Sequence, residues 1–164
     1  MIKTFDLFAG IGGFRFASDK TFKKYNINTK CVGWSEIDKY CQITYQSNFD
    51  VKEDFFIDDI KKISQLSNQN IKKKLPKFDL LFAGFPCQSF SSMGNQKSLD
   101  DERGSLFHDI IKILKAIEPN YFILENVRRI LTIDNKNTIK QIINELQNVG
   151  YKINYIVLDS KDYG

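Results

Sequence analysis

Histidine and cysteine are scarce in this sequence, with one histidine and three cysteines in 164 residues. No two cysteines have the spacing of a zinc site and their count is odd, so we expect neither a metal centre nor a disulfide framework. A catalytic dyad with histidine would have to use His108. Since His108 lies inside a segment with helical spacing, a packing or surface position is the better prediction.

Long apolar runs are also lacking. None approaches the roughly 20 residues that a bilayer-spanning helix needs, and Asp6 interrupts the apolar stretch near the N-terminus where a signal peptide would lie. We therefore expect a cytoplasmic protein with no membrane partner. The net charge of +4 permits binding to nucleic acid but does not demonstrate it, and the run Lys72–Lys74 is expected on a solvated face.

Short apolar runs alternate with longer amphipathic segments along the whole chain. Strands are expected at residues 4–8, 31–35, 55–57, 78–82, 121–124 and 151–158, and helices at 12–24, 39–48, 106–117 and 138–149. This alternation predicts an α/β fold, with a parallel sheet covered by helices on both faces and ligands at the carboxyl ends of its strands. The connection at 84–104 is unusually long, which indicates a functional loop.

Cys87 lies near the start of that loop, in the run Gly-Phe-Pro-Cys-Gln at 84–88. Pro86 fixes its own φ and holds Phe85 extended, so the approach of the thiol is constrained. A thiol at pH 7 needs a lowered pKa or a nearby proton acceptor before it can attack. Because the fourth and fifth strands should be neighbours, Glu125 is expected to emerge beside Cys87. The pair suggests a nucleophile and an acid.

The loops after the first three strands suggest a nucleoside-type ligand. Glycines at 10, 12 and 13 let the backbone approach a ligand, but their spacing is not that of the dinucleotide fingerprint. Glu36 follows the second strand, where a carboxylate can bond ribose hydroxyls, and Asp59 follows the third, where one can accept from an adenine amino group. Each acid could equally favour or cap the helix that follows it.

These motifs, in this order, resemble those of the C5-cytosine DNA methyltransferases, and the resemblance covers essentially the whole chain. Its strongest elements are residues 6–13, 84–88 and 125–127, supported by 36–40, 59–60, 103–107 and 158–164. It implies a Rossmann-like sheet that binds S-adenosylmethionine. It also implies methyl transfer to C5 of a cytosine flipped out of double-stranded DNA, as in a bacterial restriction-modification system.

The resemblance also implies roles for single residues. Cys87 would attack C6 of the cytosine, and Glu125 would bond N3 and assist its protonation. Residues around the cofactor would be Phe8, Gly10, Gly12, Gly13, Glu36, Ile37, Asp59, Ile60, Pro86 and Leu106. Residues near the DNA or the hinge of the loop would be Gln88, Ser89, Ser91 and Arg103, and Arg103 would serve equally well as a structural anchor.

Several family features are not found in these residues. They are an arginine that helps to fix the cytosine, an antiparallel strand between the fifth and sixth strands, the target recognition domain and a C-terminal helix. Residues 1–164 would then be the N-terminal part of the catalytic domain, as a fragment, a truncated product or one subunit of a split enzyme. We expect its open strand edge to favour self-association or a complementary C-terminal chain. An RNA cytosine methyltransferase and an inactive cofactor-binding scaffold are the alternatives.

Overall fold

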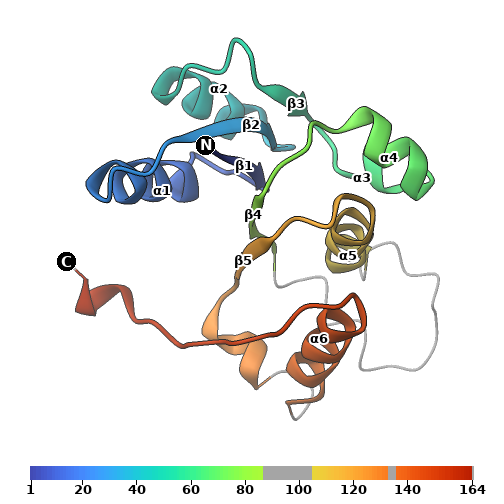
Figure 1. Ribbon diagram of the computed structural model, residues 1–164. Helices are drawn as coiled ribbons and strands as arrows, with labels where there is room; N and C mark the ends of the chain where they lie inside the picture. Colours follow the sequence, from blue (N-terminus) through green and yellow to red (C-terminus); the bar gives the residue numbers. More distant parts are fainter. Residues whose placement is uncertain (87–104, 133–135, 164) are drawn as a thin grey trace.

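The computed structural model describes residues 1–86, 105–132 and 136–163, and strands alternate with helices along them (Figure 1). The elements are β1 (Ile2–Leu7), α1 (Gly13–Lys24), β2 (Thr29–Ser35), α2 (Lys39–Asn48), β3 (Phe55–Ile57), α3 (Lys61–Ser64), α4 (Asn68–Lys74), β4 (Leu80–Gly84), α5 (Ser105–Ile117), β5 (Tyr121–Glu125), η2 (Arg128–Leu131), α6 (Asn137–Asn148) and η4 (Ser160–Asp162).

The described strands form one parallel sheet in the order β3-β2-β1-β4-β5. The order reverses at β1, because the chain first moves outward through β2 and β3 and then returns to place β4 on the other side of β1. The predicted α/β class is confirmed, and no antiparallel strand occurs among the residues described.

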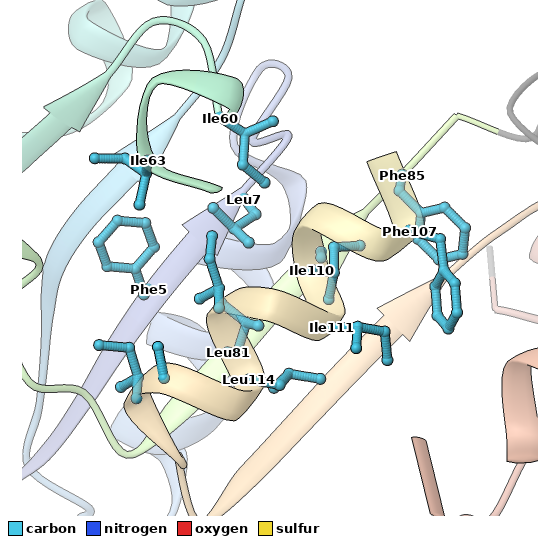
Figure 2. Packing of buried hydrophobic residues seen from close by; sticks show 14 of the residues in the cluster. Phe5, Leu7, Ile60, Ile63, Leu81, Phe85, Phe107, Ile110, Ile111 and Leu114 are labelled. Atoms are coloured by element: carbon cyan, nitrogen blue, oxygen red, sulfur yellow. The ribbon is translucent and has the colours of Figure 1, made fainter. Parts of the chain in front are cut away.

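One face of the sheet carries the larger part of the core. Phe5 and Leu7 of β1 alternate with residues of the opposite face, and Leu81 of β4 lies beside them. Figure 2 shows Leu7 and Leu81 against α5, whose Ile110 and Leu114 point to the sheet. Helices α3 and α4 complete this layer through buried Ile63 and Ile71.

Helices α1 and α2 cover the opposite face. Phe14 of α1 stacks on Phe82 of β4 with ring centroids 5.1 Å apart. Trp34 of β2 stacks on Tyr45 of α2 at 4.3 Å. The predicted arrangement with helices on both faces is therefore confirmed.

The expected strand at 151–158 is not formed. This segment leaves α6 and runs away from it without pairing to another strand of the described chain (Figure 1). Its apolar run is typical of a strand, but a strand also needs a neighbour for its backbone N–H and C=O groups. Tyr155, Ile156, Val157 and Leu158 are exposed instead.

Smaller differences concern the boundaries and the helices between β3 and β4. β4 begins at Leu80, two residues later than expected, and the short helices α3 and α4 were not predicted. Lys72–Lys74 lie exposed on α4, as expected. His108 is half exposed on α5, with Nε2 3.4 Å from Glu145 Oε1 of α6, which agrees with a surface position. Among the described helices, none is long and apolar enough to cross a membrane.

Truncation of a side chain should cost different amounts of stability on the two faces of β4 and β5. Leu81→Ala should lower the free energy of unfolding by about 2–5 kcal/mol, because it opens a cavity in the fully buried core. The control Ile123→Ala removes a half-exposed side chain from β5 and should cost less than about 1 kcal/mol. Urea unfolding of both variants measures the difference, and equal losses would contradict this assignment of the core.

Candidate active site

The glycine loop, residues 8–12 between β1 and α1, has a backbone conformation that few residues with a side chain adopt. Gly10 has a φ of +54° and Gly12 a φ of +96°, and Phe8 adopts a φ of +55° although it has a side chain. A β-carbon on Gly12 would overlap the ring of Phe49. Such strain in a non-glycine residue often occurs at a ligand site. The Phe8 N–H is directed to the hydroxyl of Ser35 at 3.4 Å, a contact that the sequence did not predict.

Glu36 ties this loop to the end of β2. Its Oε2 accepts a hydrogen bond from the Gly10 N–H at 2.7 Å, and its Oε1 accepts from the Asp38 N–H at 2.9 Å. Asp38, and not Glu36, caps α2, by accepting from the N–H groups of Tyr40 and Cys41. The helix-cap interpretation therefore applies to Asp38, whereas Glu36 is held at the glycine loop with lone pairs left for a ligand.

The third strand brings Asp59 and Ile60 to the same edge of the sheet. Asp59 Oδ1 accepts from the Lys61 N–H at 2.9 Å, in the first turn of α3, which is the capping role considered from the sequence. The Ile60 side chain is buried in the core near Leu7 (Figure 2). Any contact of Ile60 with a ligand would therefore use its backbone. Ile37, by contrast, leaves an apolar side chain 71% exposed after Glu36.

Strands β4 and β5 are neighbours, as the sequence predicted, and Gly84 pairs with Glu125 in the parallel ladder. A β-carbon on Gly84 would lie 3.4 Å from Glu125 Oε2 and 3.8 Å from the Phe14 ring. Glycine therefore keeps open the space beside the Glu125 carboxyl, which is exposed. Pro86 lies exposed two residues beyond Gly84, and Leu106 is half-buried near the start of α5.

Asn126 anchors Phe85, the residue that follows β4. Its Nδ2 donates to the Phe85 carbonyl at 2.7 Å, and its Oδ1 accepts from the Val127 N–H at 2.9 Å. This bridge joins the residue after Glu125 to the residue before Pro86. Sequence reasoning did not select Asn126 as a site residue, although its place directly after a strand end was a usable signal. Cys87, Gln88, Ser89, Ser91 and Arg103 lie outside the described residues.

A buried polar cluster lies behind the glycine loop, between the sheet and the helices α1 and α2. Arg15 Nη1 pairs with Asp54 Oδ2 at 2.6 Å and is directed to the Tyr45 hydroxyl at 3.4 Å. Burial raises the pKa of Asp6 to about 7, against the lowering effect of Arg15, and Glu36 adds to the rise. The neighbouring Tyr45 hydroxyl also lowers this pKa.

The residues at this edge of the sheet could bind a nucleoside, and the Glu125 carboxyl lies at the same edge. Backbone groups of the glycine loop, the Glu36 carboxylate and the exposed Ile37 side chain meet at the carboxyl ends of β1 and β2, and Glu125 lies at the end of β5. Ribose hydroxyls can donate to a carboxylate, and an adenine ring packs on apolar side chains. Among the described residues, no group of three or more His, Cys, Asp and Glu could hold a metal ion.

The family model for C-5 cytosine-specific DNA methylase matches residues 2–164. The chain belongs to this family. Similar relatives include the type II methyltransferases M.BanI of Aneurinibacillus aneurinilyticus, 41% identical over 99% of this chain, and M.HaeII of Haemophilus aegyptius, 43% identical over 99%. The chain spans 35% and 46% of the length of these two relatives, less than half of each.

The fold of this chain is also found in solved structures. A Spodoptera frugiperda DNMT2 mutant aligns with a TM-score of 0.64 and 27% identity, over 91% of this chain and 41% of that one. A Mesorhizobium loti S-adenosylmethionine-dependent methyltransferase, at 12% identity, aligns with a TM-score of 0.51 over 94% of this chain and 76% of its own, and supports the fold alone. The Rossmann-like methyltransferase sheet is thus confirmed.

The glycine loop predicts a contrast between two adjacent glycines. Gly12→Ala should lower the free energy of unfolding by about 2–5 kcal/mol, because it combines a left-handed φ with a β-carbon that overlaps Phe49. Gly13→Ala is the control: it lies in the first turn of α1 with no atom within 4 Å of its new β-carbon. It should leave stability unchanged or raise it by up to about 1 kcal/mol. Chemical unfolding of both variants measures this, and similar losses would contradict the proposed cause.

Proposed function

We propose that the chain supplies the cofactor-binding and nucleophile-bearing part of a DNA (cytosine-5) methyltransferase of the type II restriction-modification kind. The observation that carries the proposal is the family match over residues 2–164, combined with the Gly84–Glu125 pairing that brings the acid beside the loop leading to Cys87. A DNA substrate fits the cytoplasmic location expected from the sequence.

S-adenosylmethionine is the proposed cofactor, and when bound it supplies an electrophilic methyl group. Phe8, Gly10, Gly12 and Gly13 would hold it on the loop after β1, with Glu36 on its ribose and Ile37 beside its adenine. The Asp59 carboxylate and the Ile60 backbone would contact the adenine edge, and Pro86 and Leu106 would line the remaining side. The fit rests on an open glycine loop and on a carboxylate already oriented by the Gly10 N–H.

The reaction requires a cytosine carbon to act as a nucleophile, which an aromatic ring carbon does poorly. In the proposed step, the Cys87 thiolate adds to C6 while Glu125 donates a proton toward N3, so that the electron pair reaches C5. C5 would then take the methyl group, and the electron pair of the broken methyl–sulfur bond would stay on sulfur. Loss of the C5 proton to a base and expulsion of the thiolate from C6 would restore the aromatic ring, and return of the N3 proton to Glu125 would restore the enzyme. The base must leave the duplex for this attack.

The Asn126 bridge to Phe85 would hold the start of the Cys87 loop in register with Glu125, since it links the two loops directly. Gln88, Ser89, Ser91 and Arg103 are proposed to contact DNA or to serve the loop as it closes over the base. The names of the relatives, which are type II methyltransferases, favour DNA over RNA as the substrate.

Trapping on a duplex that carries 5-fluorocytosine tests the chemistry, because fluorine at C5 cannot leave as a proton and the Cys87 adduct persists. We expect a covalent adduct when S-adenosylmethionine is present. The reaction is run with the chain alone and with the C-terminal part of M.HaeII added. Cys87→Ser should abolish the adduct, and the control Cys41→Ser on α2 should retain it. Glu125→Gln should slow its formation by about 10²–10⁴-fold.

The absence of an adduct under both conditions would refute the catalytic proposal and leave the inactive-scaffold alternative. Trapping on an RNA duplex with the same fluorinated base tests the RNA methyltransferase alternative. An adduct on RNA but not on DNA would favour the RNA methyltransferase.

An apolar groove along β5 carries the second part of the proposal. It encloses about 490 Å³ between β5, α6 and residues 153–158, and β5 is an edge of the described sheet. Tyr121 and Ile123 of β5 are exposed beside it, as are the apolar residues 155–158. We propose that an extended segment of a complementary C-terminal chain fills this groove by pairing with β5. When that segment is not supplied, self-association covers the same surface.

Sedimentation velocity tests this docking. The chain alone should form concentration-dependent oligomers, and the C-terminal part of M.HaeII should replace them by a heterodimer. Ile123→Lys should weaken both associations at least tenfold by placing a charge on β5. The control Ile43→Lys, on the exposed side of α2, should leave them unchanged. A well-folded monomer that is stable to dilution and does not bind the added part would contradict the proposal.

A further inference from the structure

Four buried polar side-chain atoms between the sheet and helices α1 and α2 have no hydrogen-bond partner among the described residues. They are Asp6 Oδ1, Asp6 Oδ2, Trp34 Nε1 and Arg15 Nε. Asp6 and Trp34 are each 1% exposed, and the Arg15 side chain is 11% exposed. Buried polar groups are nearly always satisfied in folded proteins, so each of these atoms requires an explanation.

The four atoms belong to side chains that converge on Tyr45. Asp6 and Trp34 are register partners on β1 and β2 and lie on the same face of the sheet. The Trp34 ring stacks on Tyr45 at 4.3 Å, and the Arg15 guanidinium carbon lies 5.5 Å from the centre of the Tyr45 ring. Arg15 also acts on Asp6 directly, because its charge lowers the pKa of that carboxyl.

The rest of the Arg15 guanidinium is already engaged. Nη1 donates to Asp54 Oδ2 at 2.6 Å and Nη2 to the Asp50 carbonyl at 3.2 Å, both in the connection between α2 and β3. Nε lies 3.9 Å from Asp19 Oδ2, too far for a hydrogen bond. These contacts fix the guanidinium and leave its Nε–H as a buried donor.

The unpartnered atoms match the hydrogen-bonding capacity of one water molecule. Trp34 Nε1–H and Arg15 Nε–H are two donors, and the two oxygens of the ionised Asp6 carboxylate are two acceptors. A water molecule accepts two hydrogen bonds and donates two. Globular proteins hold about one buried water per 27 residues, usually with about three polar partners, so such a site is ordinary in a chain of this length.

We propose that Asp6, Trp34 and Arg15 form an internal hydration site that binds one ordered water molecule behind the glycine loop. The water joins three segments that each lead into the loops at the carboxyl edge. Asp6 comes two residues before Phe8, Trp34 two residues before Glu36, and Arg15 three residues after Gly12. The three residues are thus positioning residues for the cofactor loop, a consequence that rests on the proposed function, whereas the hydration site itself does not.

The single tryptophan of the chain provides a direct probe. Its indole N–H gives one signal in an NMR spectrum, and a long-lived buried water should give a dipolar cross-peak to it. We expect this cross-peak in the wild-type chain. It should be lost in Asp6→Leu, which removes both acceptors, and kept in the control Asp19→Asn, whose carboxyl lies on the outer side of Arg15. A folded wild-type chain without the cross-peak, or Asp6→Leu that retains it, would overturn the proposal.

A crystal structure of the wild-type chain tests the site even if Asp6→Leu does not fold. Water density within hydrogen-bonding distance of Asp6 and Trp34 Nε1 is the expected result, and direct bonds among these side chains with no water would refute it. Titration with S-adenosylmethionine tests the consequence, since Asp6→Leu should weaken binding at least tenfold. Wild-type chain that holds the water but does not bind S-adenosylmethionine would refute the proposed function and leave the hydration site intact.

Discussion

The reversal of strand order at β1 is the constraint on which the site depends. β2 and β4 both pair with β1, and the chain leaves the carboxyl ends of β1 and β4 toward helices on opposite faces of the sheet. No single helix can cover both ends, so the edge of the sheet stays accessible there. The glycine loop, Glu36 and Gly84 all lie at or beside this point, which is why residues far apart in sequence share one site.

Two side chains anchor the backbone where it leaves β1 and β4. Glu36 binds the Gly10 N–H of the neighbouring loop, and Asn126 binds the Phe85 carbonyl of the next one. Each bond joins the end of one strand to the backbone that leaves the adjacent strand. The Glu36 bond has a charged acceptor and is the stronger kind, whereas the Asn126 bond joins two neutral groups. Both bonds are part-buried, and they hold irregular backbone in place without a ladder. Glu36, which we propose to bind the ribose, is therefore also an anchoring group for the adjacent loop.

Much of this could be predicted from the sequence, and the reasons differ from part to part. The apolar spacing of α5 and the continuous apolar run of β5 depend only on local periodicity, and both were found. The adjacency of β4 and Glu125 followed from the rules of parallel sheets. The segment 151–158 is also largely apolar but forms no strand, because pairing depends on a neighbouring strand that the sequence pattern cannot reveal. The Asn126 bridge and the contacts of Arg15 depend on atoms brought together by packing, and spacing along the chain carries no trace of them.

Coverage of the sheet is uneven, and this links assembly to chemistry. β1 and β2 are buried where they carry Asp6, Leu7 and Trp34, whereas Tyr121 of β5 is 71% exposed. The groups proposed for the cofactor thus lie at the covered part of the sheet, and Glu125 lies at the open edge. General acids work best where water is excluded, because water then does not compete for their interactions with the substrate. Whatever pairs with β5 would change the surroundings of Glu125 as well as the stability of the sheet. Pairing of a segment with β5 and the proposed action of Glu125 as an acid are therefore expected to depend on each other.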